Sequence, residues 1–345
     1  MRKPIKQLIL FTLALVIAAG FGGAGIAVAG GTPQTLRVYN AAEYIDRTIL
    51  ADFEKAFGVQ VIYEEFDSNE EMYDRIARDP KAFDVLIPSD YAIDRLIQEG
   101  LLEKIDPAKI PNMAFIAPEY LNPAYDPANE YVVPYMVGTL GILYNKRMVP
   151  VPVDSWAALW DTQYRGRIWM WDSMRDVVGL ALKMHGFSVN SNDDAELAQA
   201  KASLLSQRQL VRYESELIRD SMIADEGTLA LVYSGDAKTA VDQNPNLAYV
   251  IPREGSNKWV DGFVIVKGTE RLEAAHNFIN FMCSPHIAIR NMTATGYTSP
   301  VFIVWEEFAS NPIMFPSAEE LARCEPFMYN KEATQKYMGI WSEVR

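Results

Sequence analysis

Aromatic and acidic side chains recur where the predicted strands of this 345-residue chain end. They are Tyr44, Tyr91, Tyr233, Trp259 and Tyr297, alongside Glu43, Asp176, Asp236 and Asp261. An organic ammonium needs this combination, because aromatic faces attract the cation, carboxylates neutralise and orient its N–H donors, and ring surfaces pack against methylenes. In Trp259-Val260-Asp261 the two-residue period of a strand places the indole and the carboxylate on one face. The pattern indicates a site for an organic amine, and a polyamine meets all three demands.

Each of these residues taken alone has a simpler interpretation. A single Tyr or Trp near a strand end commonly packs in the core, and an Asp after a strand is commonly a turn residue or a helix N-cap. Asp172 has the position of an N-cap, and Arg175 with Asp176 could form a pair in a first helical turn. Only the recurrence across several strand ends favours the amine site.

A regular alternation of strand and helix patterns must position these residues. The first half of the chain contains strand 36–39, helix 43–57, strand 59–66, a helix that opens at residue 68, strand 83–88 and helix 89–99. Gly58 and Gly100 follow two of these helices, where a glycine readily ends a helix. The alternation predicts a mostly parallel sheet with helices on both sides, and such sheets bind ligands at the carboxyl ends of their strands.

The alternation repeats after a stretch rich in Pro and Asn at 107–134, which we interpret as a crossing into a second domain. That domain is predicted to contain strand 168–171, helices 172–185 and 193–207, strand 210–213, helix 215–226 and strand 229–233. The β-rich run 263–266 could return the chain to the first domain. At about 150 residues per domain, the length also predicts two domains, each with its own core.

Charge and motifs exclude several classes of function. The 45 acidic and 32 basic residues give a net charge of −13, which disfavours nucleic-acid binding because phosphates are repelled. The chain has neither a G-x-S-x-G nor a P-loop motif, and His185, His276 and His286 lack metal-ligand spacing. We therefore expect no catalytic residue, metal or cofactor. A disulfide between Cys283 and Cys324 stays open, since spacing alone cannot establish it.

The N-terminal segment has the layout of a secretory signal. Three basic residues within the first six positions precede an uncharged run over 8–29, which ends in Ala-Val-Ala. This predicts a signal peptide over residues 1–29, with cleavage after Ala29 and export of the mature protein. The run is also long enough for an uncleaved membrane anchor, although its glycine-rich second half makes a poor spanning helix.

Several short strings together carry a resemblance to a known family. They are Val38-Tyr39-Asn40-Ala41-Ala42-Glu43-Tyr44, Asp67-Ser68-Asn69-Glu70, Phe83-Asp84-Val85-Leu86-Ile87-Pro88-Ser89, Ser155-Trp156, Ile251-Pro252-Arg253-Glu254-Gly255 and Gly296-Tyr297. Their order and spacing resemble the periplasmic spermidine/putrescine-binding proteins of ABC importers. The resemblance implies a type II periplasmic-binding-protein fold, in which two α/β lobes, each a mostly parallel sheet flanked by helices, enclose a ligand cleft. The lobes it implies are 30–138 with 262–304, and 139–261 with 305–345.

The same resemblance implies a function. The chain would be a periplasmic receptor, a monomer without catalytic activity, that binds a polyamine and delivers it to an ABC permease of the inner membrane. A membrane-anchored form stays open. Two alternatives also stay open: a receptor of this fold for another small solute, and an exported hydrolase that uses Asp236 and Asp261 as paired carboxylates.

Site residues follow from the resemblance one position at a time. It assigns Glu43 and Tyr44 to a first site loop, Ser89 and Tyr91 to a second, Ser215 and Asp176 to polar contacts of the second lobe, Trp259 and Asp261 to a W-x-D element, and Tyr297 to the site. Tyr233 begins a Tyr-x-Gly-Asp element of the putrescine-preferring type, in which Asp236 would hold the distal ammonium. Ala41 stands where the family usually has a tryptophan, and Ser173 where the spermidine-preferring type has a carboxylate. The charges therefore favour a diamine.

Overall fold

Ten strands in the described part of the chain form one sheet, in the order β2-β1-β3-β10-β5-β8-β6-β7, with β4 paired to β10 and β9 paired to β5. The structure is a computed structural model that describes residues 34–214 and 217–345, and residues 35–345 form one unit. The strands are β1 (Gln34–Ala41), β2 (Val59–Phe66), β3 (Val85–Ile87), β4 (Leu102–Glu103), β5 (Val133–Asn145), β6 (Ile168–Trp171), β7 (Val211–Glu214), β8 (Leu229–Tyr233), β9 (Leu247–Val250) and β10 (Lys258–Val266).

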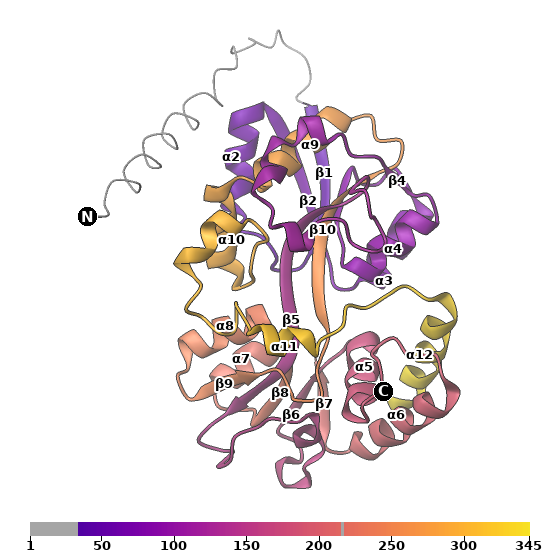
Figure 1. Cartoon of the computed structure of the whole chain (residues 1–345), viewed down its shortest axis with the longest axis vertical. Helices are drawn as coiled ribbons and strands as arrows, with labels where there is room; N and C mark the ends of the chain where they lie inside the picture. The colour runs from indigo at the N-terminus through magenta and orange to yellow at the C-terminus, as the bar shows by residue number, and fades with distance from the viewer. Residues whose placement is uncertain (1–33, 215–216) are drawn as a thin grey trace, which may run out of the picture. The chain divides into compact units, whose positions relative to one another are not determined.

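Helices flank this sheet on both sides (Figure 1). The α-helices of the described residues are α2 (Thr48–Phe57), α3 (Asn69–Arg78), α4 (Asp90–Gln98), α5 (Met174–Met184), α6 (Asp194–Gln207), α7 (Ile218–Ile223), α8 (Ser234–Gln243), α9 (Leu272–Met282), α10 (Pro285–Thr295), α11 (Ala318–Ala322) and α12 (Lys331–Val344). Short 3-10 helices are η1 (Pro107–Lys109), η2 (Pro111–Phe115), η3 (Pro118–Tyr120), η4 (Trp156–Trp160), η5 (Thr162–Tyr164) and η6 (Phe302–Glu307).

Two long strands, β5 and β10, run side by side through the middle of this unit (Figure 1). They pair antiparallel from Lys258 opposite Thr139 to Phe263 opposite Val133, with an irregularity in register between Asp261 and Gly262. The pairs of β1 with β3 and of β6 with β7 and β8 are parallel, as the alternation predicts. Pairs that involve β5 or β10 are antiparallel, so the sheet is mixed where the chain crosses.

The buried side chains separate into clusters on either side of this crossing. We call the part around β1–β3, α2–α4, α9 and α10 the first lobe, and the part around β6–β9, α5–α8 and α12 the second lobe. Val304 and Met314 still pack with the first-lobe cluster, whereas Tyr337 and Ile340 of α12 pack with the second. The lobe boundaries stay a prediction, and this packing favours a return crossing after Met314.

Local sequence explains where several helices begin and end. Ser68 accepts a hydrogen bond from the Glu71 amide and so caps α3, and Gly58 ends α2 with a φ of 68°, a left-handed conformation that suits glycine. The helix predicted over 43–57 begins only at Thr48, because Glu43 itself has a φ of 55°. The prediction that Asp172 caps a helix is wrong: α5 begins at Met174 after Ser173, and the Asp172 carboxylate pairs with Arg345.

Other sequence expectations concern the thiols and the surface. Cys283 and Cys324 are both buried and free, so the disulfide left open by the sequence is not formed in this structure.

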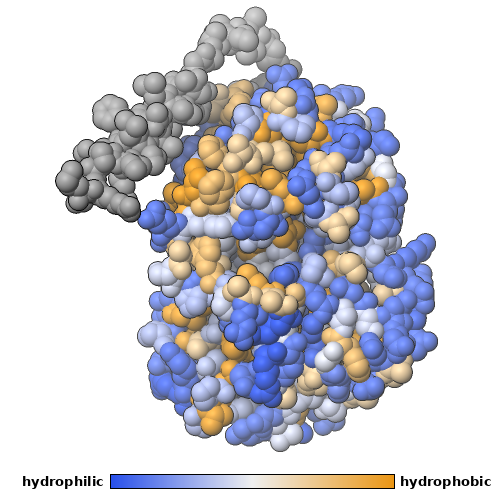
Figure 2. Space-filling view, viewed as in Figure 1, coloured by the Kyte–Doolittle hydropathy of each residue, from blue (hydrophilic) through white to orange (hydrophobic). Residues whose placement is uncertain are grey.

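Within residues 34–214 and 217–345, no helix combines the length and apolar character needed to cross a bilayer. On the face in Figure 2, hydrophilic side chains predominate and hydrophobic ones gather mainly over the first lobe. The predicted signal peptide, including Ala29, lies outside the described residues.

Candidate functional site

Aromatic rings from both lobes pack together beside the crossing strands. The ring centroid of Tyr44 lies 5.1 Å from that of Tyr297 and 6.3 Å from that of Trp259, which is itself 5.3 Å from Tyr297. Tyr233 approaches Trp259 from the second lobe at 6.4 Å and packs against the core clusters of both lobes. We call Tyr44, Tyr233, Trp259 and Tyr297 the aromatic cluster. Sequence analysis predicted all four, and the fold brings them together.

Two glycines allow this close packing. A β-carbon on Gly235, at the start of α8, would lie 2.5 Å from the ring of Tyr297. A β-carbon on Gly138, in β5, would lie 2.4 Å from the ring of Trp259. Both distances are far below van der Waals contact, so any larger residue would displace a ring of the cluster.

Asp261 supplies a buried carboxylate at the aromatic cluster. It lies in β10, next to the register irregularity, and only 8% of the residue is exposed. Its Oδ1 atom accepts no hydrogen bond from any described residue, and Tyr44 Oη and Trp259 Nε1 are likewise buried without a partner. Burial raises the pKa of Asp261 to about 7, although the side chains of Tyr44 and Ser89 oppose this effect. The Oδ1 atom of Asp261 is therefore left as an acceptor for a donor group of a ligand.

A second buried carboxylate, Asp176, comes from the first turn of α5 in the second lobe. Its Oδ2 accepts a hydrogen bond of 2.6 Å from the Tyr233 hydroxyl, which links it to the aromatic cluster. Burial raises the pKa of Asp176, against the opposing effects of Ser173 and Tyr233. Ser173, which stands where the spermidine-preferring type has a carboxylate, thus places a hydroxyl beside Asp176.

Asp90 is a buried carboxylate that sequence analysis did not assign to the site. Its Oδ1 accepts a hydrogen bond of 2.7 Å from the Tyr91 amide, and burial together with the negative charge of Asp261 raises its pKa well above the ordinary value. In the sequence this residue follows predicted strand 83–88, but it also lies in the first turn of a predicted helix, where an acidic residue is ordinary. Tyr135, whose ring lies 5.5 Å from Tyr44, was also missed, because it belongs to a continuous apolar run.

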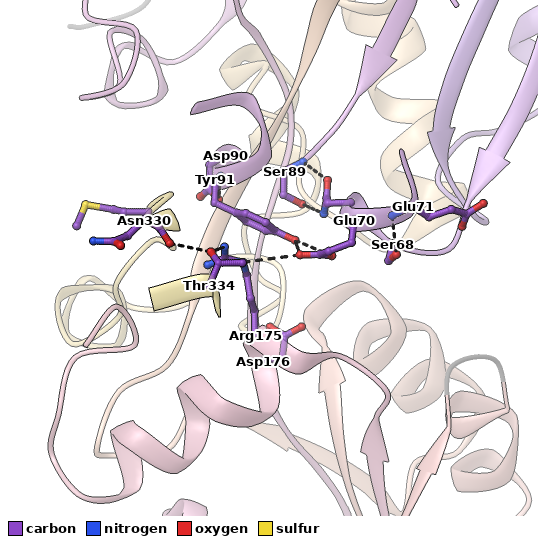
Figure 3. A network of polar contacts seen from close by, with 12 residues as sticks. Ser68, Glu70, Glu71, Ser89, Asp90, Tyr91, Arg175, Asp176, Asn330 and Thr334 are labelled. Carbon is purple, nitrogen blue, oxygen red and sulfur yellow. Dashed lines mark hydrogen bonds and ion pairs between the residues drawn. The ribbon is translucent and has the colours of Figure 1, made fainter. Parts of the chain in front are cut away.

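A network around Arg175 connects the lobes on one side of the cluster (Figure 3). The guanidinium of Arg175 lies 4.1 Å from the centroid of the Tyr91 ring, and its Nε atom lies 3.9 Å from Glu70 Oε1. Its Nη2 atom donates to Thr334 Oγ1 of α12 at 2.7 Å. Tyr91, predicted to contact the ligand, therefore already stacks on an arginine of the other lobe. Ser89 lies nearby and accepts a hydrogen bond from Asn69 Nδ2 at 3.1 Å.

A second interlobe contact involves the predicted site residues Glu43 and Asp236. Arg219 Nη1 lies 3.0 Å from Glu43 Oε2 and 3.4 Å from Asp236 Oδ1. The Tyr297 hydroxyl donates to Asp236 Oδ2 at 3.2 Å. The Glu43 side chain is 74% exposed, so it lies at the edge of the site rather than within it. Burial raises the pKa of Asp236, against the opposing effects of Arg219 and Tyr297.

The fold thus gathers most of the predicted residues, but not all of them in the same role. Asp261 and Asp176 join the aromatic cluster, whereas Glu43 and Tyr91 contact arginines of the second lobe. Ser215 lies outside the described residues. Ala41, in place of the family's usual tryptophan, is partly exposed and packs against first-lobe clusters. In the described part of the chain, no three His, Cys, Asp or Glu residues are grouped as metal ligands.

Two lobes joined by a pair of long strands, with a polar and aromatic site between them, define the class of two-lobe solute receptors. The family model of the bacterial extracellular solute-binding proteins matches residues 48–316, and the chain belongs to this family. The family consists of receptors and not of enzymes. The fold inferred from the resemblance is confirmed.

Relatives with known names support this placement. The chain is 31% identical over 318 residues to the spermidine/putrescine-binding periplasmic protein of Escherichia coli strain K12. The alignment covers 90% of this chain and 91% of that protein. It is 29% identical over 371 residues to the putrescine-binding periplasmic protein SpuD of Pseudomonas aeruginosa strain UCBPP-PA14, covering 100% of this chain and 99% of that one.

A solved structure of a protein with a similar name also resembles this chain. The spermidine/putrescine ABC transporter substrate-binding protein PotD of Streptococcus pneumoniae has a TM-score of 0.78 and 35% identity, over 90% of this chain and 98% of that chain.

Proposed function

We propose that this protein is the periplasmic receptor of an ABC importer and binds a diamine such as putrescine between its two lobes. The observation that carries the proposal is the buried Asp261 carboxylate, whose Oδ1 has no partner among the described residues, beside Tyr44 and Trp259. An ammonium group at this position would pair with the carboxylate, while the rings would attract the charge and pack against the methylene chain.

The number of carboxylates supports a ligand with two ammonium groups. Asp261 lies on a crossing strand whose tryptophan packs with the first lobe, and Asp176 lies on α5 of the second lobe. Both are buried, and the hydroxyl of Tyr233 stabilises Asp176 without neutralising it. A diammonium ion between the two carboxylates would neutralise both and draw the lobes together, which would couple binding to closure.

The remaining predicted contacts complete the proposed site. Tyr44, Tyr233, Trp259 and Tyr297 would form its walls, and Ser89 and Ser215 would supply hydroxyl groups. Because the rings pack directly on one another at 5.1–6.4 Å, a ligand that enters between them must separate them. Binding should therefore change the fluorescence of Trp259.

The relatives support the same proposal. Two of them carry the names spermidine/putrescine-binding and putrescine-binding periplasmic protein, and the matched family is one of solute receptors. We accordingly propose that the chain acts without catalysis, as a monomer that delivers its ligand to an inner-membrane permease. The net charge of −13 is favourable for a cationic ligand and unfavourable for nucleic acid.

Thermal unfolding with a panel of solutes tests the proposal. A ligand that binds only the folded protein stabilises it by about 2.7 kcal/mol at a hundredfold excess over Kd, so putrescine or spermidine should raise Tm. An amino acid, a sugar and phosphate serve as controls. If one of these raises Tm while neither amine does, the protein is a receptor for another solute. Recovery of unchanged putrescine after long incubation would support binding without catalysis.

A further inference from the structure

Arg219 is a cation that the protein itself brings to the edge of the proposed site. It lies in α7 of the second lobe, and its Nη1 atom contacts both Glu43 of the first lobe and Asp236 of α8, at 3.0 and 3.4 Å. Its Nε atom lies 3.3 Å from Asp220, whose side chain is mostly exposed. One guanidinium therefore offsets part of the negative charge at this edge and joins the two lobes.

Asp236 is consequently satisfied before any ligand arrives. Arg219 contacts its Oδ1, and the Tyr297 hydroxyl donates to its Oδ2. Asp261 differs, because its Oδ1 has no partner within the described residues. Asp176 differs too, because it accepts a hydrogen bond from the neutral hydroxyl of Tyr233, while the guanidinium of the adjacent Arg175 is held over Tyr91.

We infer that Arg219 determines specificity by occupying the Glu43–Asp236 carboxylate pair, so that the site accepts two ligand ammonium groups and disfavours a third. The inference rests on the proposed function and revises the role expected for Asp236 from the resemblance. A diamine pairs with Asp261 and Asp176 and leaves Arg219 in place. A triamine that sends its extra ammonium toward Asp236 either displaces Arg219 or lies beside it, and both outcomes weaken binding.

The role of Arg219 in closure differs from that of the ligand. Because Arg219 connects α7 to Glu43 directly, this contact joins the lobes in the ligand-free protein. Loss of the Arg219–Glu43 contact should weaken the binding of every ligand. Loss of the positive charge beside Asp236 should change the ratio between the dissociation constants of two ligands. The ratio of two dissociation constants therefore isolates the specificity effect.

Calorimetric titration of wild type and Arg219→Gln with putrescine and spermidine tests the inference. Hydrogen bonds to charged groups are commonly worth enough to change affinity by about tenfold or more, so the variant should shift the affinity ratio toward spermidine by about tenfold. Arg219→Lys keeps the cation and should retain the wild-type ratio. The exposed pair of Arg253 with Asp154 offers a matched control, and Arg253→Gln should also leave the ratio unchanged.

A double variant identifies the carboxylate that responds. In Arg219→Gln combined with Asp236→Asn the gain for spermidine should disappear, because the released carboxylate is gone. The inference is overturned if Arg219→Gln keeps the wild-type ratio, or if the gain survives in the double variant. If wild type binds neither amine, the proposed function fails and the inference with it. If wild type binds putrescine but the ratio never moves, the inference alone fails.

Discussion

Replacing Asp261 by asparagine should weaken putrescine binding and also remove much of its dependence on pH. The substitution keeps the size of the side chain and eliminates a buried carboxylate whose pKa is raised to about 7 by burial. Loss of one partner of a desolvated, hydrogen-bonded charge pair commonly costs about 2–5 kcal/mol, which is about thirtyfold or more in Kd. The pH dependence supplies a sharper test than this loss alone.

The magnitude follows from the raised pKa. A bound ammonium requires the ionised carboxylate, whereas the ligand-free protein holds a proton on Asp261 in about half of its molecules at pH 7. Because protonation of Asp261 competes with binding, the measured Kd equals the Kd of the ionised protein multiplied by 1 + 10^(pKa − pH). The Kd should therefore rise about fiftyfold from pH 7 to pH 5. Asp176, whose pKa burial also raises, would act in the same direction.

The assay is calorimetric titration with putrescine at pH 5, 7 and 8. Repeating the pH 7 titration in buffers with different ionisation enthalpies measures the protons released on binding, which should be about half a proton from Asp261. In Asp261→Asn this release should fall and the affinity should change less between pH 5 and 7. Equal affinity of wild type at pH 5 and 7, or the same pH dependence in the variant, would refute the reasoning.

The same carboxylate affects the stability of the ligand-free protein with a definite sign. Its pKa of about 7 in the folded state exceeds the ordinary value of 3.8, so the folded state binds more protons between these pH values. The free energy of unfolding therefore falls as pH rises from about 4 to 7, by at most about 4 kcal/mol. Asp261→Asn should be more stable than wild type toward urea at pH 8, and similar to it at pH 4, in the absence of ligand.

Three further substitutions, and one control, test other parts of the structure. Gly235→Ala should push the ring of Tyr297 away and raise the Kd for putrescine while the protein stays folded, as circular dichroism would verify. Arg175→Met removes a guanidinium that stacks on the first lobe, and titration should show about tenfold weaker binding; unchanged affinity would contradict its role in closure. Gly255→Ala would place a β-carbon 1.9 Å from a main-chain oxygen at a φ of +87°, so Tm should fall by several degrees. Gly268→Ala, with a φ of +78° and open space, should cost less.

Sequence patterns predicted the alternating strands and helices well, because those patterns report local burial. The end of α2 at Gly58 and a mostly parallel sheet were both expected, and β1 pairs parallel with β3. The two crossings were expected as well, but the antiparallel pairing of β5 with β10 was not, because it joins segments more than a hundred residues apart. Local composition carries no information on such a pairing.

The site was predictable to a similar extent. Residue types at strand ends identified the aromatic cluster and Asp261, since amine binding requires those types. The partner of Glu43 could not be predicted, because Arg219 stands 176 residues from it in the sequence. Nothing in the sequence around Arg219 distinguishes it from an ordinary surface arginine. Charge pairs across lobes are set by the fold and not by neighbouring residues.

The paired strands β5 and β10 have a consequence for the order of events during capture. Trp259 and Asp261 lie on this ribbon, next to its register irregularity, so rotation of one lobe about the ribbon should displace them less than residues farther from it. Asp176 and Tyr233 belong to the second lobe and travel with it. We therefore expect an incoming amine to bind first to the half-site on the ribbon and the first lobe, and the second lobe to close on it afterwards. Residues on the ribbon should govern the association rate, and those of the second lobe should govern how long the ligand is retained.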